Sequence, residues 1–221
     1  MANIHFLVGG SGKMAELALR TLCERGSASK FGADTPLPSF DSIVAINFGS
    51  QATFDKLLAF CEEHGIPLIQ ASTGQKLPEV VKTAVIVAPN LALPIVALMG
   101  VLPAIREALE PFGMEFGVVE GHHPDKTGVP GTAQAMAAAW KSLVFSVREK
   151  FTQLVMGVPQ EAMAGHGHHF LFALGGGVEI CISTKVNGRV PYIESLPWLG
   201  KKILDSHLPC GFRTIQELLG S

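Results

Sequence analysis

The fold is decided by the stretch Ile4-His5-Phe6-Leu7-Val8-Gly9-Gly10-Ser11-Gly12-Lys13-Met14. It opens on a mainly apolar run, which is typical of a parallel strand buried on both faces. A glycine-rich turn follows, and apolar residues then recur at helical spacing from Met14 to Arg25, where Gly26 ends the pattern. The stretch therefore predicts a strand, a tight turn and a helix, which together begin a parallel α/β sheet.

Strand and helix patterns alternate along the first part of the chain. The expected strands are 4–8, 42–47, 67–71 and 83–88, and the expected helices are 14–25, 52–64 and 77–82. Strands separated by helices imply right-handed crossovers and a parallel sheet. The segment 27–38 is rich in Ser, Gly, Pro and Asp, so we expect a loop there, with the usual second strand shortened or lost. Residues 1–90 are therefore predicted to form a Rossmann-like α/β domain that binds a dinucleotide.

The pattern changes after Pro89-Asn90, where we place a domain boundary. The expected elements beyond it are a helix at 91–109, a strand at 115–120, a helix at 132–150, strands at 169–174 and 178–184, and helices at 194–204 and 215–219. Three glycines join the last two strands and indicate a hairpin. Residues 91–208 are therefore predicted to form a second, α+β domain.

The composition excludes several classes of function. Charged residues make up 16% of the 221 residues and the formal net charge is -2, which gives no electrostatic basis for binding nucleic acid or an anionic membrane. The longest apolar run, 91–102, is far shorter than the roughly 20 residues of a membrane-spanning helix. The four cysteines are widely spaced, which favours reduced thiols, and the first residues lead into a strand pattern without a secretory signal. We expect a cytoplasmic enzyme.

Groups suited to catalysis concentrate in Glu120-Gly121-His122-His123-Pro124-Asp125-Lys126, which is followed by Pro130-Gly131-Thr132-Ala133. Histidine suits proton donation because its unperturbed pKa lies near neutral pH, and a nearby ammonium group can hold carboxylates. Gly131 and Thr132 begin a predicted helix, and the N-terminus of a helix attracts carboxylates. Two adjacent histidines alone are more often part of a polar loop, so the functional interpretation depends on the lysine and the helix start as well.

These runs closely resemble the signature of the dihydrodipicolinate reductases (4-hydroxy-tetrahydrodipicolinate reductases), lysine-pathway enzymes that reduce a cyclic imine dicarboxylate. The family's signature reads E-x-H-H-x-x-K-x-D-x-P-S-G-T-A. The resemblance implies that His122 is the catalytic proton donor and that Lys126 is its catalytic partner. The substrate-binding residues that it implies are His123, Gly131 and Thr132. Two departures, Gly128 in place of the family's Asp and a missing Ser before Gly131, leave the exact substrate open.

The glycine-rich turn lacks the strict G-x-G-x-x-G pattern but resembles the same family's own version, G-x-x-G-[RK]-M-G. The cofactor-binding residues that the resemblance implies are Gly9, Gly12, Lys13, Met14, Phe48, Thr73, Gly74, Pro89 and Asn90. No convincing second strand ends in an acidic residue for the ribose 2′-hydroxyl, and Lys13 and Lys30 are the basic residues available to a 2′-phosphate. The expected cofactor is NADPH or NADH, with NADPH favoured. The alternative is that these are ordinary strand-end loops.

For the whole chain, the resemblance implies a small-molecule cyclic imine dicarboxylate as substrate and a homotetramer assembled through the sheet of the second domain. It also implies that residues 209–221 pack back on the first domain. No metal is expected, because His166, His168 and His169 lack a carboxylate or cysteine at ligand spacing. Three alternatives stay open: a non-catalytic relative that binds a dicarboxylate or nucleotide, a reductase of a different imine acid, and a Rossmann dehydrogenase of an aldehyde or hydroxy acid.

Overall fold

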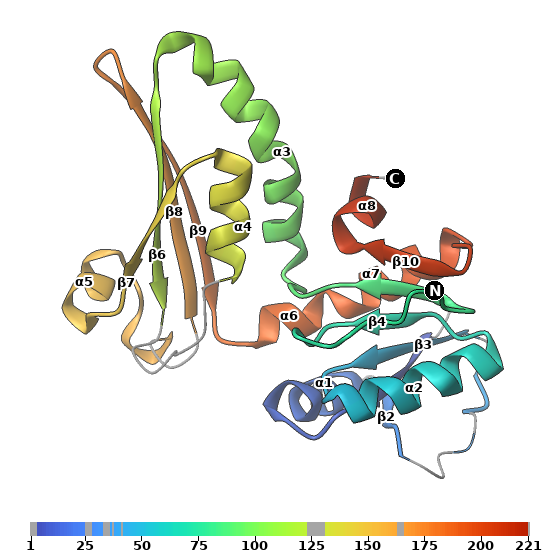
Figure 1. Ribbon diagram of the computed structural model, residues 1–221. Coiled ribbons are helices and arrows are strands. Elements are labelled where there is room, and N and C mark those ends of the chain that lie inside the picture. The colour runs from blue at the N-terminus through green and yellow to red at the C-terminus, as the bar shows by residue number, and fades with distance from the viewer. Residues whose placement is uncertain are drawn as a thin grey trace. The chain divides into compact units, whose positions relative to one another are not determined.

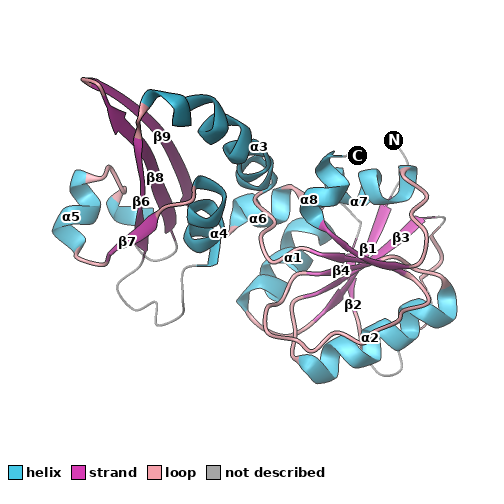
Figure 2. Ribbon diagram, turned by 45° about the horizontal axis from the view of Figure 1, so that its top comes forward, coloured by secondary structure: helices cyan, strands magenta, loops and turns pink. Residues whose placement is uncertain are grey.

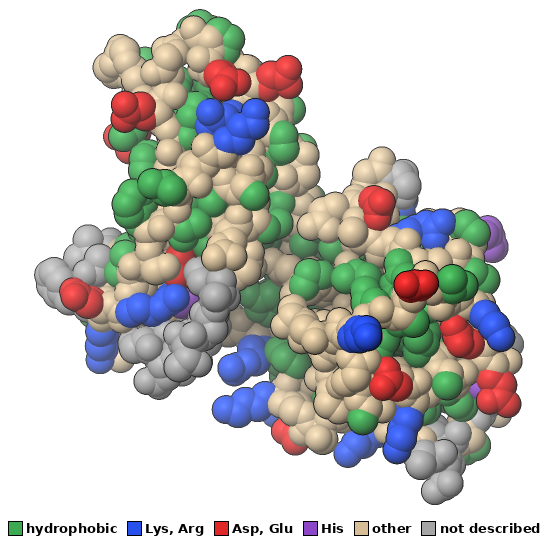
Figure 3. Space-filling view, viewed as in Figure 1, with side chains coloured by type: hydrophobic (Ala, Val, Ile, Leu, Met, Phe, Trp, Pro, Cys, Tyr) green, Lys and Arg blue, Asp and Glu red, His purple; other side chains and the backbone are tan. Residues whose placement is uncertain are grey.

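The computed structural model describes residues 4–24, 28–32, 36, 38–40, 42–122, 131–162 and 166–220. The chain forms two compact units, which are drawn in Figure 1. Residues 1–91 and 192–221 make up the first unit, and residues 92–191 make up the second. On the face seen in Figure 3, basic and acidic side chains are interspersed, in keeping with the formal net charge of -2. Among the described residues, no helix combines the length and the apolar character needed to cross a membrane.

The first unit is built on a six-stranded sheet whose strands all run parallel, in the order β10-β5-β4-β3-β1-β2. The strands are β1 (Ile4–Gly9), β2 (Ala28–Lys30), β3 (Ser42–Asn47), β4 (Leu68–Gln70), β5 (Ala84–Val87) and β10 (Gly211–Thr214). The helices are α1 (Lys13–Cys23), α2 (Gln51–His64), α7 (Leu196–Asp205) and α8 (Ile215–Gly220). The predicted α/β fold class with a Rossmann-like parallel sheet is confirmed.

The two edge strands of this sheet are the ones that the sequence pattern did not define. β2 pairs with β1 over three residues, so the second strand is shortened rather than lost. His5 of β1 shares a hydrogen bond of 2.8 Å with Ser29 of β2, and its ring stacks on Phe40 at a centroid distance of 4.2 Å. At the other edge, β10 pairs in parallel with β5 and leads into α8.

Helices cover both faces of the first sheet, as Figure 2 shows for α2 and α7. Leu7 and Leu68 pack against Phe54 of α2 in a buried apolar cluster. On α7, a Cβ at Gly200 would lie 2.7 Å from the ring of Phe6, so glycine allows this helix to approach β1 closely. We expected residues 192–208 in the second domain. They group with the first unit because α7 packs on β1.

The second unit contains a four-stranded sheet in the order β7-β6-β8-β9. Its strands are β6 (Glu115–His122), β7 (Leu143–Val147), β8 (His166–Gly175) and β9 (Val178–Asn187). β6 and β7 are parallel and the other pairs are antiparallel, and the predicted hairpin of β8 and β9 is confirmed. The helices are α3 (Leu93–Leu109), η1 (Glu110–Phe112), α4 (Gly131–Trp140), α5 (Lys150–Val155) and η2 (Gln160–Ala162), and α6 (Val190–Glu194) leads back to the first unit. Figure 2 shows α3 and α4 on the same side of this sheet.

The predicted helix at 132–150 is wrong beyond Trp140. The buried Trp140 donates a hydrogen bond of 3.0 Å from its indole nitrogen to the carbonyl oxygen of Phe172, and Lys141 adopts a positive φ of 45° that ends the helix. The residues that follow form β7. This strand pairs with β6, which precedes α4 and is therefore distant in the sequence. Tertiary pairing therefore overrides the local helical spacing in this segment.

The predicted helix at 77–82 is also wrong, because this segment is a loop along α2. Side chains of α2 accept its backbone N–H groups: Gln51 accepts from Lys76 at 2.7 Å and Glu62 accepts from Lys82 at 2.8 Å. These two bonds replace hydrogen bonds that a helix would otherwise supply.

Candidate active site

The carboxyl ends of the strands in the first unit bring the predicted cofactor residues to one edge of the sheet. β1 and β3 are neighbours, and the chain leaves them in opposite directions, to β2 and to β4. Such a switch point is where an open parallel sheet binds its ligand. The backbone N–H of Phe48 donates to the carbonyl oxygen of Gly9 at 2.9 Å, and this bond joins the residue after β3 to the end of β1. Thr73 and Gly74 follow β4, and Pro89 and Asn90 follow β5.

Two glycines give the turn after β1 its shape. Gly10 has a φ of +120°, and a Cβ there would lie 3.0 Å from the backbone nitrogen of Gly49. Gly12 precedes α1 with no side-chain capping bond, and a Cβ at Gly12 would meet no atom within 4 Å. The turn therefore leaves room at Gly12, next to the start of α1, and the first N–H groups of a helix lack partners within the helix. The residues present fit the pyrophosphate of a nicotinamide dinucleotide.

A buried amide network links the loops that follow β3 and β4. Asn47, fully buried, donates from its side-chain nitrogen to Gln70 at 2.9 Å and accepts from the backbone N–H of Gly49 at 2.9 Å. Gln70 donates in turn to Gln75 at 3.1 Å, and Gln75 donates to the carbonyl oxygen of Gly49 at 3.1 Å. The network fixes the loop of Phe48 against the loop that contains Thr73.

A hollow of about 230 Å³ lies at the carboxyl end of β2. Its lining consists of Phe31, Gly32, Ala52, Thr53 and Lys56. The first two residues follow β2 directly and the others begin α2, so the hollow stands where a Rossmann sheet accommodates adenosine. Lys56 is exposed, and it adds a cation that the sequence pattern had not marked.

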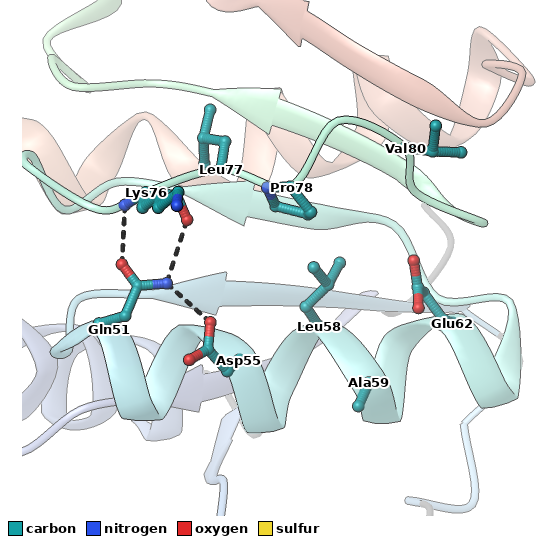
Figure 4. Close-up of a pocket in the computed structure, with 9 residues that line it drawn as sticks. All are labelled: Gln51, Asp55, Leu58, Ala59, Glu62, Lys76, Leu77, Pro78 and Val80. Carbon is teal, nitrogen blue, oxygen red and sulfur yellow. Dashed lines mark hydrogen bonds between the residues drawn. The ribbon is translucent and has the colours of Figure 1, made fainter.

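A larger hollow, of about 560 Å³, lies between α2 and the loop at 76–80 (Figure 4). The residues that line it are Gln51, Asp55, Leu58, Ala59, Glu62, Lys76, Leu77, Pro78 and Val80. Gln51 donates to Asp55 at 2.7 Å and to the carbonyl oxygen of Lys76 at 3.1 Å, which closes one end of the hollow. None of the predicted site residues lines it.

The second unit places a buried carboxylate beside the predicted proton donor. Glu120 and His122 lie two residues apart on β6, so their side chains share one face of the sheet. Glu120 has a fully buried side chain that accepts a hydrogen bond from Nδ1 of His122, whose own side chain is 12% exposed. Arg148, just beyond β7, lies 2.9 Å from the other carboxylate oxygen of Glu120. The histidine therefore belongs to a charged, hydrogen-bonded cluster.

The electrostatics of this cluster keep the carboxylate ionised. Burial works to raise the pKa of the Glu120 carboxyl group. The hydrogen bonds that it accepts from His122, Ser146 and Arg148 outweigh burial and lower the pKa to about 2. At neutral pH, Glu120 is therefore an anion held at the side of the imidazole ring.

Two further side chains pack around His122. The ring of His169 on β8 lies 6.0 Å from the ring of His122 in an edge-on arrangement, and it shares a hydrogen bond of 3.0 Å with Thr184. Gln153 of α5 is buried and donates from its side chain to the backbone carbonyl oxygen of His122. The neighbouring His168 points to the opposite face of the sheet, where it shares a hydrogen bond of 2.8 Å with Asn187. In the described part of the chain, no group of three or more metal-ligating side chains comes together.

No family model matches the chain. A 4-hydroxy-tetrahydrodipicolinate reductase of Stenotrophomonas maltophilia is 36% identical to it over 46% of this chain and 44% of the relative. Reductases of the same name from Rubrobacter xylanophilus and Xylella fastidiosa are 31% and 26% identical, over 55% and 70% of this chain and 47% and 71% of the relatives. Over part of its length, the chain is therefore similar in sequence to the 4-hydroxy-tetrahydrodipicolinate reductases.

The similarity to these reductases extends to the fold. A dihydrodipicolinate reductase from Paenisporosarcina, solved with dipicolinate bound, matches over 98% of this chain and 99% of that chain, with a TM-score of 0.68 at 13% identity. A diaminopimelate dehydrogenase of C. glutamicum matches with a TM-score of 0.50 at 11% identity, over 98% of this chain and 94% of that chain. The chain spans less than half the length of the first two reductases named above.

Some of the residues expected from the reductase signature lie in the described part of the chain and others do not. His122 ends β6, and Gly131 and Thr132 begin α4, all in the second unit. His123 and Lys126 lie outside the described residues. A Cβ at Gly131 would meet no described residue within 4 Å.

Sequence reasoning missed the residues that support the predicted proton donor and those that support the predicted cofactor loops. Arg148 and Gln153 carry no local signal, because their contacts with Glu120 and His122 depend on how β7 and α5 pack on β6. Gln70 did carry one, since it is a polar residue at the end of an otherwise apolar strand. A buried polar side chain in that place needs a partner, and this need could have indicated the amide network.

Proposed function

We propose that this chain is a reductase that uses NADPH or NADH to reduce a cyclic imine dicarboxylate of the dihydrodipicolinate type. The observation that carries the proposal is the buried pair of Glu120 and His122 at the end of β6, beside the signature segment that leads to α4. Similarity to the 4-hydroxy-tetrahydrodipicolinate reductases supports the substrate class. His122 and Lys126 are the proposed catalytic residues.

In the proposed reaction, His122 delivers the proton that balances hydride addition. Because Glu120 engages Nδ1 of the ring, the doubly protonated ring would transfer the proton from its other nitrogen, Nε2, and return to the neutral Nδ1–H form. Thr132 and the backbone N–H of Gly131, at the start of α4, would hold a substrate carboxylate together with His123. Lys126 would add an ammonium group that offsets the negative charge of the reacting ring.

The first unit would hold the cofactor over the turn from Gly9 to Met14. When bound, the nicotinamide ring supplies the hydride. The open space at Gly12 and the first N–H groups of α1 would receive the pyrophosphate. Phe48, Thr73, Gly74, Pro89 and Asn90 are the proposed residues around the nicotinamide.

Lys56 favours NADPH over NADH, because it lines the hollow after β2 while Lys30 ends that strand. We expect Lys56→Ala to raise the Kd for NADPH about tenfold, because one hydrogen bond to a charged group would be lost. The Kd for NADH should not change. Fluorescence titration with each cofactor measures both constants. Lys82→Ala, an exposed lysine before the amino end of β5, is the matched control. Equal losses for the two cofactors would contradict a role at the 2′-phosphate.

We also propose that the chain forms a homotetramer through the second sheet. Apolar side chains stand exposed on the sheet face opposite α3 and α4, including Leu143 at 73% and Phe145 at 55% exposure. Phe145→Glu is expected to convert tetramers into smaller species in size-exclusion chromatography with light scattering. Phe112→Glu changes an equally apolar, exposed residue away from the sheet and should leave the assembly intact. An unchanged mass for Phe145→Glu would refute this interface.

The function is tested by mixing the protein with NADPH, and separately with NADH, and with enzymatically generated dihydrodipicolinate precursor. Loss of nicotinamide absorbance that depends on the precursor is the expected result. Binding of dipicolinate and NADPH without turnover would favour a non-catalytic relative. Turnover of another imine acid alone would change the substrate and keep the reaction class.

A further inference from the structure

We propose that Glu120 and Arg148 form a positioning pair that sets the tautomer and orientation of the His122 ring. The inference rests on the proposed function, because it matters for catalysis only if His122 is the proton donor. Neither residue touches the substrate in this proposal. Both act through the imidazole ring, so they are positioning residues.

The carboxylate of Glu120 is held on both of its oxygens. One oxygen accepts from Nδ1 of His122, and the other lies 2.9 Å from Nη2 of Arg148. The side chain is fully buried on β6 and lies in register with Ser146 of β7. A carboxylate fixed in this way cannot rotate away from the ring. Because an ionised carboxylate can only accept hydrogen bonds, the ring nitrogen that faces it must carry a proton. The neutral ring is therefore held as the Nδ1–H tautomer.

Arg148 suits this role because of where β7 ends. Ser146 stands opposite Glu120 in the parallel pair, and Arg148 lies two residues further on, so its side chain projects to the same face of the sheet. The guanidinium group of this cationic side chain is 29% exposed. Its positive charge compensates the negative charge of the buried carboxylate.

The main chain of His122 is fixed from another element. Gln153 donates to the carbonyl oxygen of His122 and, at 3.4 Å, to that of Val147 at the end of β7. The ends of β6 and β7 are thus joined through one buried amide of α5. Side chain and backbone of the proposed proton donor are both held, as a group that must transfer a proton to a fixed substrate atom requires.

Several other charged or titratable groups surround the ring. His169 faces it from β8 on the same side of the sheet, and His168 and Lys185 lie on the opposite side. Among the described groups, Glu120 is the carboxylate that hydrogen-bonds to the ring. Because the pKa of Glu120 is about 2 against an ordinary value of 4.5, its ionised form stabilises the fold above about pH 4.5, and this contribution is lost as the pH falls towards 2.

The test is Glu120→Gln, read by ¹⁵N NMR of the histidine rings and by steady-state kinetics. The amide can donate a hydrogen bond to Nδ1, so we expect the His122 ring to shift from the Nδ1–H to the Nε2–H tautomer. We expect kcat to fall by about 10²- to 10⁴-fold while the Kd for NADPH stays within twofold of wild type. Glu115→Gln, on the exposed start of the same strand, is the control and should change neither reading.

Arg148→Gln is the second variant, chosen because its side chain is partly exposed and its loss is easier for the fold to tolerate. It should lower kcat in the same direction and raise the pH at which the protein unfolds in acid, because Glu120 would lose its permanent cation. The tautomer is read without turnover, so a failure of the proposed reaction leaves this test intact. A His122 ring with the wild-type tautomer and a wild-type kcat in folded Glu120→Gln would overturn the positioning role.

Discussion

Replacing His122 by asparagine is expected to lower kcat for imine reduction by about 10²- to 10⁴-fold, the range over which a general acid contributes. Asparagine keeps an N–H near the place of Nδ1, so Glu120 retains a donor and the variant should fold. It removes the nitrogen that would carry the proton to the substrate. The loss should therefore appear in kcat and leave cofactor binding unchanged, as measured by steady-state kinetics and by fluorescence titration with NADPH.

His207→Asn provides the matched control for this variant. His207 is an exposed histidine with a positive φ of 42°, a conformation that asparagine tolerates well, and it lies in the first unit. Its replacement should change neither kcat nor the Kd for NADPH. A His122→Asn enzyme that keeps more than a tenth of the wild-type kcat would show that another group delivers the proton.

Replacing Gly10 by alanine is expected to damage both the fold and the cofactor site. The positive φ of 120° is one that side-chain-bearing residues rarely adopt, and the added Cβ would lie 3.0 Å from the backbone of Phe48 and Gly49. Strain and overpacking together should lower the free energy of unfolding by about 3 kcal/mol. Urea unfolding measures this loss, and NADPH titration should show that binding is lost with it.

Gly12→Ala separates the two effects. Its φ of -85° is ordinary and its Cβ would meet no atom within 4 Å, so the free energy of unfolding should fall by only about 1 kcal/mol, the cost of alanine at a helix N-cap. The methyl group would, however, stand in the space proposed for the pyrophosphate and weaken NADPH binding. A stable Gly12→Ala protein with wild-type affinity would contradict the placement of the cofactor over this turn.

The parts of the fold that the sequence predicted are those set by local pattern. β1, its glycine turn and α1 follow one another directly, and each has a clear period and stop signal. β2 was harder because its three residues, Ala28 to Lys30, contain no alternation that a pattern can register. The end of α4 was missed for a different reason. The alanine-rich helical spacing gives way at Lys141 to a strand whose stability comes from its pairing with β6.

In the candidate site, too, local sequence pattern located some residues and tertiary packing determined the others. Resemblance located His122, Gly131 and Thr132 from their order in the chain, which is local information. The partners that hold His122 could not be found in that way, because Arg148 and Gln153 reach it only through sheet register and the packing of α5. The buried pair of Asn47 and Gln70 likewise depends on β3 and β4 being neighbours. Sequence order therefore indicates the proposed proton donor, and tertiary structure supplies the groups that contact it.

The proposed activity is hydride transfer from a nicotinamide cofactor to a cyclic imine dicarboxylate. The most direct measurement uses NADPH that carries deuterium at the transferable ring position, with dihydrodipicolinate precursor generated in the reaction. Mass spectrometry of the reduced product should then show the mass increase of one deuterium, and His122→Asn should form this product about 10²- to 10⁴-fold more slowly. Unconsumed NADPH and no reduced product, with folded protein that binds the cofactor, would contradict this proposal.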